Sequence, residues 1–222
     1  MPAYQDLENE SVNHMSRAVL RGVPVGSTID IGCSNGSWSR HARKYWPNSS
    51  SLLVDANPAH RPALEQYMLE MPRSHVKFGA AGPSVGKVKF FATSDPLSGT
   101  VSLGMPGEFE VDQFSIDAMV EESKLPPPYF LKLDTHGYEL EILQGAAKTI
   151  RDTTMIQLEV YNFRLREGVP VFPEMCFHMD KLGYRLADVF QVMHRPSDGL
   201  MWQADALFES KAAPWWRNNG WP

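Results

Sequence analysis

Cysteine is scarce in this chain of 222 residues, which excludes a fold held together by disulfide bonds. The only two are Cys33 and Cys176, and no Cys or His spacing resembles a zinc site. An excess of positive charge is also missing, because 21 Lys and Arg residues stand against 26 Asp and Glu residues for a net charge of -5. A mildly acidic chain lacks the electrostatic footprint of a general nucleic-acid binder.

Long apolar runs are absent as well. No stretch approaches the roughly 18 apolar residues of a membrane span, and the N-terminal sequence MPAYQDLENE is polar and acidic, unlike a secretory signal. We therefore expect a cytoplasmic protein with reduced thiols that neither inserts into membranes nor binds nucleic acid.

The composition is that of a globular protein, with 43% hydrophobic and 21% charged residues. Short apolar runs, each followed by a turn and a stretch of helical periodicity, predict a doubly wound, mostly parallel α/β sheet. The predicted strands cover residues 28–31, 51–54, 76–78, 85–93, 129–134 and 155–160, with a closing antiparallel pair at 184–193 and 201–208. Residues 94–108 contain several Gly and Pro residues, which predict a loop.

Acidic residues lie at or near the ends of several of these predicted strands. Asp30, Asp55 and Asp134 each stand at the end of a strand, and Glu159 lies near the end of another. Each could simply cap a helix. Ligands of open α/β sheets bind beyond the carboxyl ends of the strands, however, so four acids in such places indicate a ligand site.

The first turn, from Gly32 to Gly36, differs from a dinucleotide-binding turn. Ser34 stands where the middle Gly of Gly-x-Gly-x-x-Gly would be, and Asp30 would repel a diphosphate. An acid here suits S-adenosylmethionine, which carries a sulfonium and an ammonium but no phosphate.

Asp55 follows Asp30 by 25 residues, near the offset of an acid that accepts hydrogen bonds from ribose hydroxyls and repels a 2′-phosphate. We expect the cofactor to be held by Asp30, Gly32, Cys33, Ser34, Asn35, Gly36, Asp55, Ala56 and Asn57.

Residues 130–146, FLKLDTHGYELEILQGA, closely resemble a family signature. FkbM-type S-adenosylmethionine-dependent methyltransferases carry Leu-Lys-Ile-Asp-x-x-Gly-x-Glu followed by Leu-x-Gly-Ala. Weaker matches occur at 114–117, 156–160, 182–184 and 205–208. The resemblance covers residues 27–209, and leaves a helical N-terminal extension, 1–26, and a Trp-rich tail, 210–222, outside the methyltransferase domain.

This resemblance implies a Rossmann-like class I methyltransferase fold with seven strands, the last antiparallel and inserted between the fifth and sixth. It also implies methyl transfer from S-adenosylmethionine, usually to a hydroxyl oxygen of a natural product or sugar. His136 departs from the family, which commonly has Glu or Gln there.

We expect Asp134, His136 and Glu159 to face the acceptor. His136 has a suitable unperturbed pKa to accept the acceptor's proton near neutral pH. The alternative is Mg²⁺ held by Asp134 and Glu159, which would lower the pKa of the acceptor hydroxyl.

The sequence thus predicts an S-adenosylmethionine-dependent O-methyltransferase that acts on a small molecule. Three alternatives stay open: a nicotinamide-dependent oxidoreductase, a non-catalytic module that binds S-adenosylmethionine, and methylation at nitrogen or carbon. A homo-oligomer is compatible with the sequence, and the acceptor is not defined by it.

Overall fold

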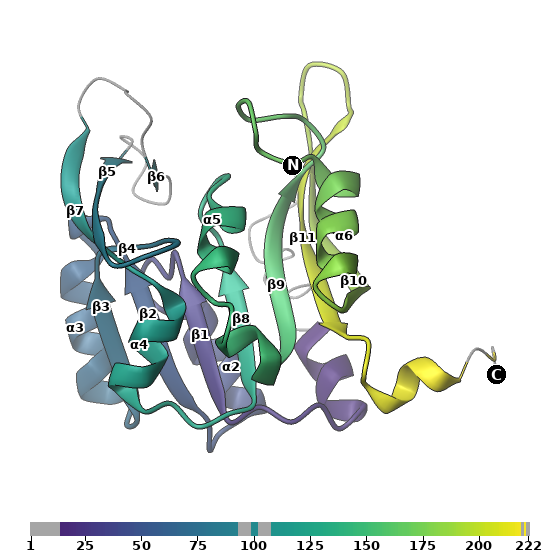
Figure 1. The fold of residues 1–222 in the computed structure, drawn as a ribbon, viewed down its shortest axis with the longest axis horizontal. Coiled ribbons are helices and arrows are strands. Elements are labelled where there is room, and N and C mark those ends of the chain that lie inside the picture. The colour runs from purple at the N-terminus through teal and green to yellow at the C-terminus, as the bar shows by residue number, and fades with distance from the viewer. Residues whose placement is uncertain (1–13, 93–98, 102–107, 219, 221–222) are drawn as a thin grey trace. The chain divides into compact units, whose positions relative to one another are not determined.

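The computed structural model describes residues 14–92, 99–101, 108–218 and 220 (Figure 1). They fall into two compact units. We call residues 25–153 the central unit, and residues 1–24 with 154–222 the terminal unit.

Four parallel strands form the main sheet of the central unit, in the order β8-β1-β2-β3. Their bounds are Ser27–Ile31 for β1, Ser50–Asp55 for β2, Ser74–Phe78 for β3 and Tyr129–Leu133 for β8. All residues of β1 and β8 are buried, because helices cover both faces of a parallel sheet. The predictions at 28–31, 51–54 and 129–134 are confirmed.

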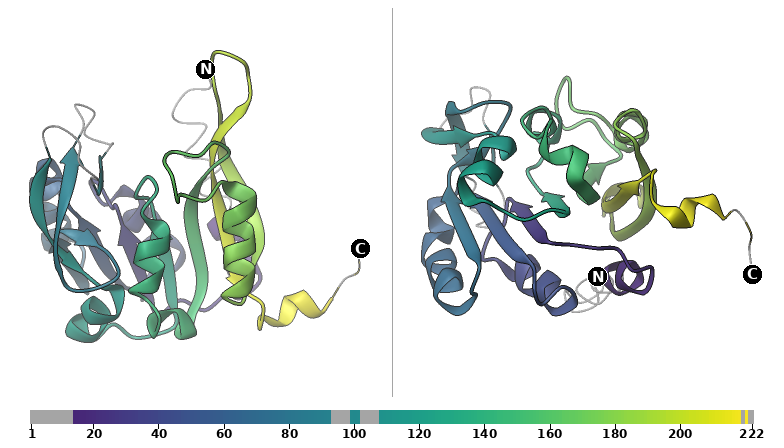
Figure 2. Two further views of the ribbon diagram at one scale, coloured as in Figure 1. Left: turned by 45° about the horizontal axis from the view of Figure 1, so that its top comes forward. Right: turned by 60° about the horizontal axis from the view of Figure 1, so that its bottom comes forward.

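The helices of the central unit lie on both faces of this sheet (Figures 1 and 2). They are α2 (Ser37–Tyr45), η1 (Pro58–His60), α3 (Arg61–Glu70), α4 (Ile116–Ser123), α5 (Glu139–Gln144) and η2 (Thr149–Asp152). Helix α2 buries Trp38, whose ring packs against Phe130 of β8 with centroids 5.0 Å apart. This aromatic contact anchors α2 to the strand that carries Lys132 and leads to Asp134.

A second, four-stranded sheet in the order β4-β7-β5-β6 is inserted between β3 and α4. Its strands are β4 (Ala80–Ala81), β5 (Gly86–Ala92), β6 (Gly99–Val101) and β7 (Phe109–Phe114). The strand predicted at 85–93 is confirmed, whereas the loop prediction for 94–108 is wrong at residues 99–101. These residues form β6, in which Val101 pairs with Phe90 of β5. The strand is stabilised by this pairing with a distant segment, and the Gly-rich local sequence gives no sign of it. Residues 93–98 and 102–107 lie outside the described part of the chain.

Two residues of the segments that resemble the FkbM family, Asp117 and Gly145, have structural roles. Asp117 accepts hydrogen bonds from the backbone amides of Lys148 and Thr149, at 2.9 and 2.8 Å, and so caps η2. A Cβ added to Gly145 would lie 2.1 Å from the carbonyl oxygen of Gly82, so only glycine allows this approach.

The terminal unit carries β9 (Thr153–Tyr161, which begins at the boundary), α6 (Phe172–Lys181), β10 (Tyr184–His194), β11 (Met201–Ser210) and η3 (Pro214–Arg217). The last strand, β11, lies between β9 and β10 and runs antiparallel to both. This is the predicted insertion of the last strand between the fifth and sixth. Together with the parallel strands of the central unit, it confirms the α/β, class I methyltransferase-like fold class.

Both predicted extensions contact the strands of the terminal unit. Residues 14–20 are helical. Arg17 of this helix pairs with Asp188, and Arg21, just after it, pairs with Glu209. In the Trp-rich tail, the indole N–H of Trp215 donates to Glu209 at 2.8 Å. The described part of the tail therefore packs on its own unit. No helix among the described residues is long and apolar enough to cross a membrane.

His14 generates a testable prediction, because its ring is buried in a stack on Phe190 with centroids 3.9 Å apart. Burial, helped by the charge of Arg17, lowers the pKa of His14 to about 3. Below pH 6.5 His14 becomes protonated in the unfolded chain but stays neutral in the folded chain. Acidification therefore lowers the free energy of unfolding. We expect His14 to cost about 2 kcal/mol of stability between pH 7 and 5.

Urea denaturation at both pH values measures this effect. His14→Phe should remove that share of the pH dependence, while the surface variant His41→Asn should keep it. If the free energy of unfolding of His14→Phe depended on pH as that of the wild type does, His14 would not be a buried neutral group in the folded chain.

Candidate active site

Two turns meet at the carboxyl ends of the adjacent strands β1 and β8. The first runs from Gly32 to Gly36, and the second from Asp134 to Tyr138. Gly32 has φ +74°, and a Cβ there would lie 2.0 Å from the carbonyl oxygen of Asp134. Only glycine permits this contact, which explains the Gly that follows Asp30-Ile31. The structure thus brings together two of the predicted site segments.

The first turn has a strained backbone that local packing holds in place. Ser34 adopts a left-handed conformation with φ 49°, and Gly36 has φ 77°. A Cβ on Gly36 would meet the Tyr67 ring at 2.8 Å, so the turn lies directly against α3. Asn35 is exposed, and its side chain accepts a hydrogen bond from the Ser37 amide at 3.0 Å.

Asp55 ties this turn to the loop after β2. Its two carboxylate oxygens accept hydrogen bonds from the amides of Ser34, at 2.7 Å, and Asn57, at 2.8 Å. The ring of His60 lies beside it, with Nδ1 3.1 Å from Asp55 Oδ1. His60 was not among the site residues predicted from the sequence. It lies five residues after Asp55, in the short helix that Asn57 caps, and this position could have indicated that its ring lies near Asp55.

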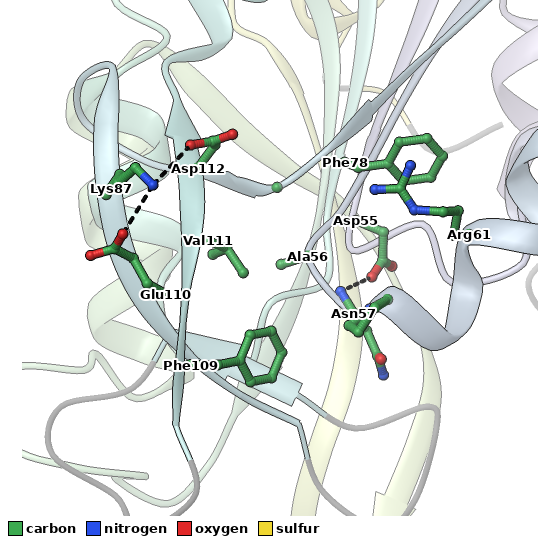
Figure 3. Close-up of a pocket in the computed structure, with 12 residues that line it drawn as sticks. Asp55, Ala56, Asn57, Arg61, Phe78, Lys87, Phe109, Glu110, Val111 and Asp112 are labelled. Carbon is green, nitrogen blue, oxygen red and sulfur yellow. Dashed lines mark hydrogen bonds and ion pairs between the residues drawn. The ribbon is translucent and has the colours of Figure 1, made fainter.

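A pocket of about 250 Å³ opens beside Asp55 in the central unit (Figure 3). Ala56, Phe78, Phe109 and Val111 give it apolar walls, and the guanidinium of Arg61 stacks on Phe78 at 3.9 Å. Its other lining residues are Asp55, Asn57, Pro58, Gly79, Lys87, Glu110 and Asp112. A flat, partly apolar group joined to a hydroxylated one fits a pocket of this kind.

The inserted sheet supplies several of these walls. Lys87 of β5 pairs with Glu110 of β7 at 2.9 Å on the far side of the pocket from Asp55 (Figure 3). Sequence reasoning missed the lining from this sheet, because β7 was not predicted. The alternation of apolar and acidic residues from Phe109 to Asp112 was the signal that could have shown it.

Asp30 lies under the first turn and not in the pocket. Its side chain is fully buried and accepts hydrogen bonds from the Ser39 hydroxyl at 2.7 Å and from Lys132 at 3.3 Å. Burial raises the pKa of Asp30, against the opposing charge of Lys132. This geometry gives Asp30 a supporting role, and its predicted direct contact with a cofactor stays untested. Burial, then the charges of Asp30 and Asp55, raises the pKa of Cys33 well above its usual value, so Cys33 is a packed thiol.

Lys132 joins the two turns electrostatically. Its ammonium lies 3.3 Å from Asp30 Oδ1 and 3.1 Å from Asp134 Oδ2, with only 9% of the side chain exposed. Two carboxylates therefore share one cation. Asp134 keeps 35% of its side chain exposed, so it can meet a ligand, whereas the side chain of Asp30 is fully buried.

The second turn presents His136 next to Asp134. A ring nitrogen of His136 and a carboxylate oxygen of Asp134 lie within 4.8 Å of each other. His136 has φ 55°, an unusual backbone conformation for a residue with a side chain. Strain of this kind persists where the surroundings enforce it and is concentrated at functional sites.

Glu139 helps to hold the backbone of His136 in this conformation. Its Oε1 accepts hydrogen bonds from the Thr135 amide at 3.3 Å, the Thr135 hydroxyl at 3.0 Å and the Gly137 amide at 3.1 Å. From β6, the Thr100 hydroxyl reaches the carbonyls of Thr135 and His136 at 3.3 and 3.4 Å. The inserted sheet thus supports the turn that carries His136.

Glu159, the fourth predicted acid, belongs to the terminal unit. It is buried near the end of β9, where its carboxylate accepts hydrogen bonds from the Tyr161 hydroxyl and, at 2.7 Å, from Gln203. The expectations that it faces the same acceptor as Asp134, or holds Mg²⁺ with it, remain predictions.

The fold and the acidic turns define a class I methyltransferase-type protein. Residues 30–186 match the model of the FkbM methyltransferase domain, and the chain therefore belongs to this family. It is 26% identical over 134 residues to the hexuronic acid methyltransferase AglP of Haloferax volcanii, which covers 60% of this chain but 54% of AglP. The chain thus matches about half of the length of this relative.

Solved structures support the fold. The FkbM methyltransferase of Methylobacillus flagellatus KT superposes with a TM-score of 0.55 at 15% identity, over 82% of this chain and 43% of that one. A protein of Klebsiella pneumoniae, provisionally assigned as an O-methyltransferase, gives a TM-score of 0.56 at 11% identity, over 96% and 84%.

The shared ion pair under the turns generates a second prediction. Lys132→Met would leave Asp30 buried without its cation, and we expect a loss of about 3–5 kcal/mol of stability. Lys77→Met breaks an ion pair between the exposed Glu122 and a partly exposed lysine, so it should cost less than about 1 kcal/mol.

Urea denaturation measures both variants. The double variant Asp30→Asn/Lys132→Met should recover part of the loss, because it removes the unpaired charge. Equal effects of Lys132→Met and Lys77→Met would contradict a structural role for the buried pair.

Proposed function

We propose that this protein is an S-adenosylmethionine-dependent methyltransferase that methylates a hydroxyl oxygen of a sugar. The observation that carries the proposal is Asp55, a fixed carboxylate at the end of β2 with the pocket beside it. A ribose needs such an acceptor for its adjacent hydroxyls, and the apolar walls of Ala56, Phe78 and Val111 suit the adenine ring.

The residues of the central unit fit S-adenosylmethionine better than a dinucleotide. The first turn carries Ser34 in place of the middle Gly, and the carboxylates of Asp30 and Asp55 lie beneath and beside it. These negative charges disfavour a diphosphate and favour a ligand with a sulfonium and an ammonium. A nicotinamide cofactor is the less suitable ligand on this ground.

When bound, S-adenosylmethionine supplies a methyl group already activated by its sulfonium. The protein then has to hold the acceptor and take its proton. His136 is suited to this step, because the second turn fixes its backbone and Asp134 lies beside it to stabilise a protonated ring. The ammonium of Lys132, 3.1 Å from Asp134, opposes a divalent cation there, so we favour His136 as base over Mg²⁺ assistance.

The sugar acceptor rests on the similarity to AglP, which is named for its action on hexuronic acid. The non-catalytic alternative remains distinct, since it predicts cofactor binding without turnover on any sugar. Turnover of the wild-type protein on a sugar separates the two. His136→Ala should then keep S-adenosylhomocysteine binding while it lowers the rate of methyl transfer about 100-fold.

Calorimetry with S-adenosylhomocysteine and with NAD tests the cofactor. We expect the first to bind and the second not. Asp55→Ala should weaken binding about 10- to 100-fold, the value of hydrogen bonds to a charged acceptor. Glu121→Ala, an exposed acid on α4, should have no effect. Binding of NAD, with no response to S-adenosylhomocysteine, would refute the proposal.

A further inference from the structure

The hairpin of β10 and β11 continues past the end of β9 in the terminal unit (Figure 1). Tyr161, the last residue of β9, pairs with Gln203, and the Asn162 amide then donates to the Trp202 carbonyl at 2.9 Å. The hairpin goes on to the pairing of His194 with Met201. Its end lies beyond the carboxyl end of β9, which is where α/β sheets bind ligands.

Aromatic rings gather at this place. Phe163 contacts two partners. Its ring stacks on the indole of Trp202 with centroids 5.4 Å apart, and the guanidinium of Arg195 lies 3.8 Å from the centre of its ring. Tyr161 packs edge-on against Trp202 at 6.1 Å. Phe163 and Trp202 remain partly exposed although they have close neighbours. Rings that pack against one another form a rigid surface, which loses little conformational entropy when a ligand binds.

Polar groups with fixed directions adjoin the rings. The carboxylate of Glu159 is held by Tyr161 and Gln203, so it can accept hydrogen bonds from hydroxyls without reorganising. Arg195 binds Asp198 through Nε and Nη2, while its Nη1 donates to no residue in the described part of the chain. Arg195 is about one-third exposed, and a pair at that exposure adds little stability, so a ligand carboxylate can replace Asp198 at small cost.

We infer that Phe163, Trp202, Arg195, Glu159 and Gln203 form the acceptor-binding surface, and that the acceptor is a sugar with a carboxylate group. This inference rests on the proposed function. The apolar C–H faces of a sugar ring match the aromatic rings, its hydroxyls match Glu159 and Gln203, and its carboxylate matches the planar donor fork of Arg195. The cation is the specificity determinant, since an uncharged sugar offers it hydroxyl oxygens but no negative charge.

The test is a titration of protein labelled with ¹⁵N at tryptophan, followed by NMR of the indole N–H groups. The chain has six tryptophans, and Trp202→Phe assigns the signal of Trp202. The titrants are glucuronate and glucose, and each titration is made with and without S-adenosylhomocysteine. Glucuronate should shift the Trp202 signal at lower concentration than glucose does. Arg195→Gln should weaken glucuronate binding about tenfold.

The chain offers a matched control at the other end of β10. Arg185 stacks on Trp216 at 4.9 Å in the same unit, so Arg185→Gln removes an equivalent cation–ring contact and should leave the glucuronate response unchanged. The inference is overturned if glucuronate does not shift Trp202, if glucose binds equally well, or if Arg195→Gln behaves as the wild type does. Failure to bind S-adenosylhomocysteine counts against the proposed function alone, because the response of Trp202 is measured in its absence as well.

Discussion

The ammonium of Lys132, shared by Asp30 and Asp134, is the interaction on which the candidate site depends. A fully buried carboxylate is tolerated only when it is paired and hydrogen-bonded, and Asp30 meets both conditions through Lys132 and Ser39. The same lysine holds Asp134 at the start of the second turn. The close packing of Gly32 on the Asp134 carbonyl then fixes the two turns against each other. One buried cation thus connects the turn assigned to the cofactor with the turn assigned to the acceptor.

Much of this arrangement could be predicted from the sequence, because it depends on local patterns. Continuous apolar runs that end in Asp30, Asp55 and Asp134 identify strands of a parallel sheet and the edge where ligands bind. The antiparallel position of β11 between β9 and β10 followed from the family resemblance around 130–146 and is confirmed. The structural roles of Asp117 and Gly145 explain why that resemblance extends beyond the site itself.

The parts that could not be predicted depend on contacts between distant segments. The buried place of Asp30 under the first turn depends on Ser39 and Lys132, which bind its oxygens, and its expected contact with the cofactor stays a prediction. The strand β6 consists of three residues stabilised by pairing with β5, and no local periodicity announces so short an element. His60 lies next to Asp55 only because η1 turns the chain back after β2. Side-chain identity alone specifies none of these contacts.

The central claim is that the carboxyl-end turns of β1 and β2 hold an adenosine through Asp55 and the adjoining pocket. A crystal structure of the protein with S-adenosylhomocysteine tests it most directly. The account predicts density for the ribose hydroxyls within hydrogen-bond distance of Asp55 and for the adenine between Ala56 and Val111. An adenosine bound elsewhere on the protein, with this pocket empty, would contradict it.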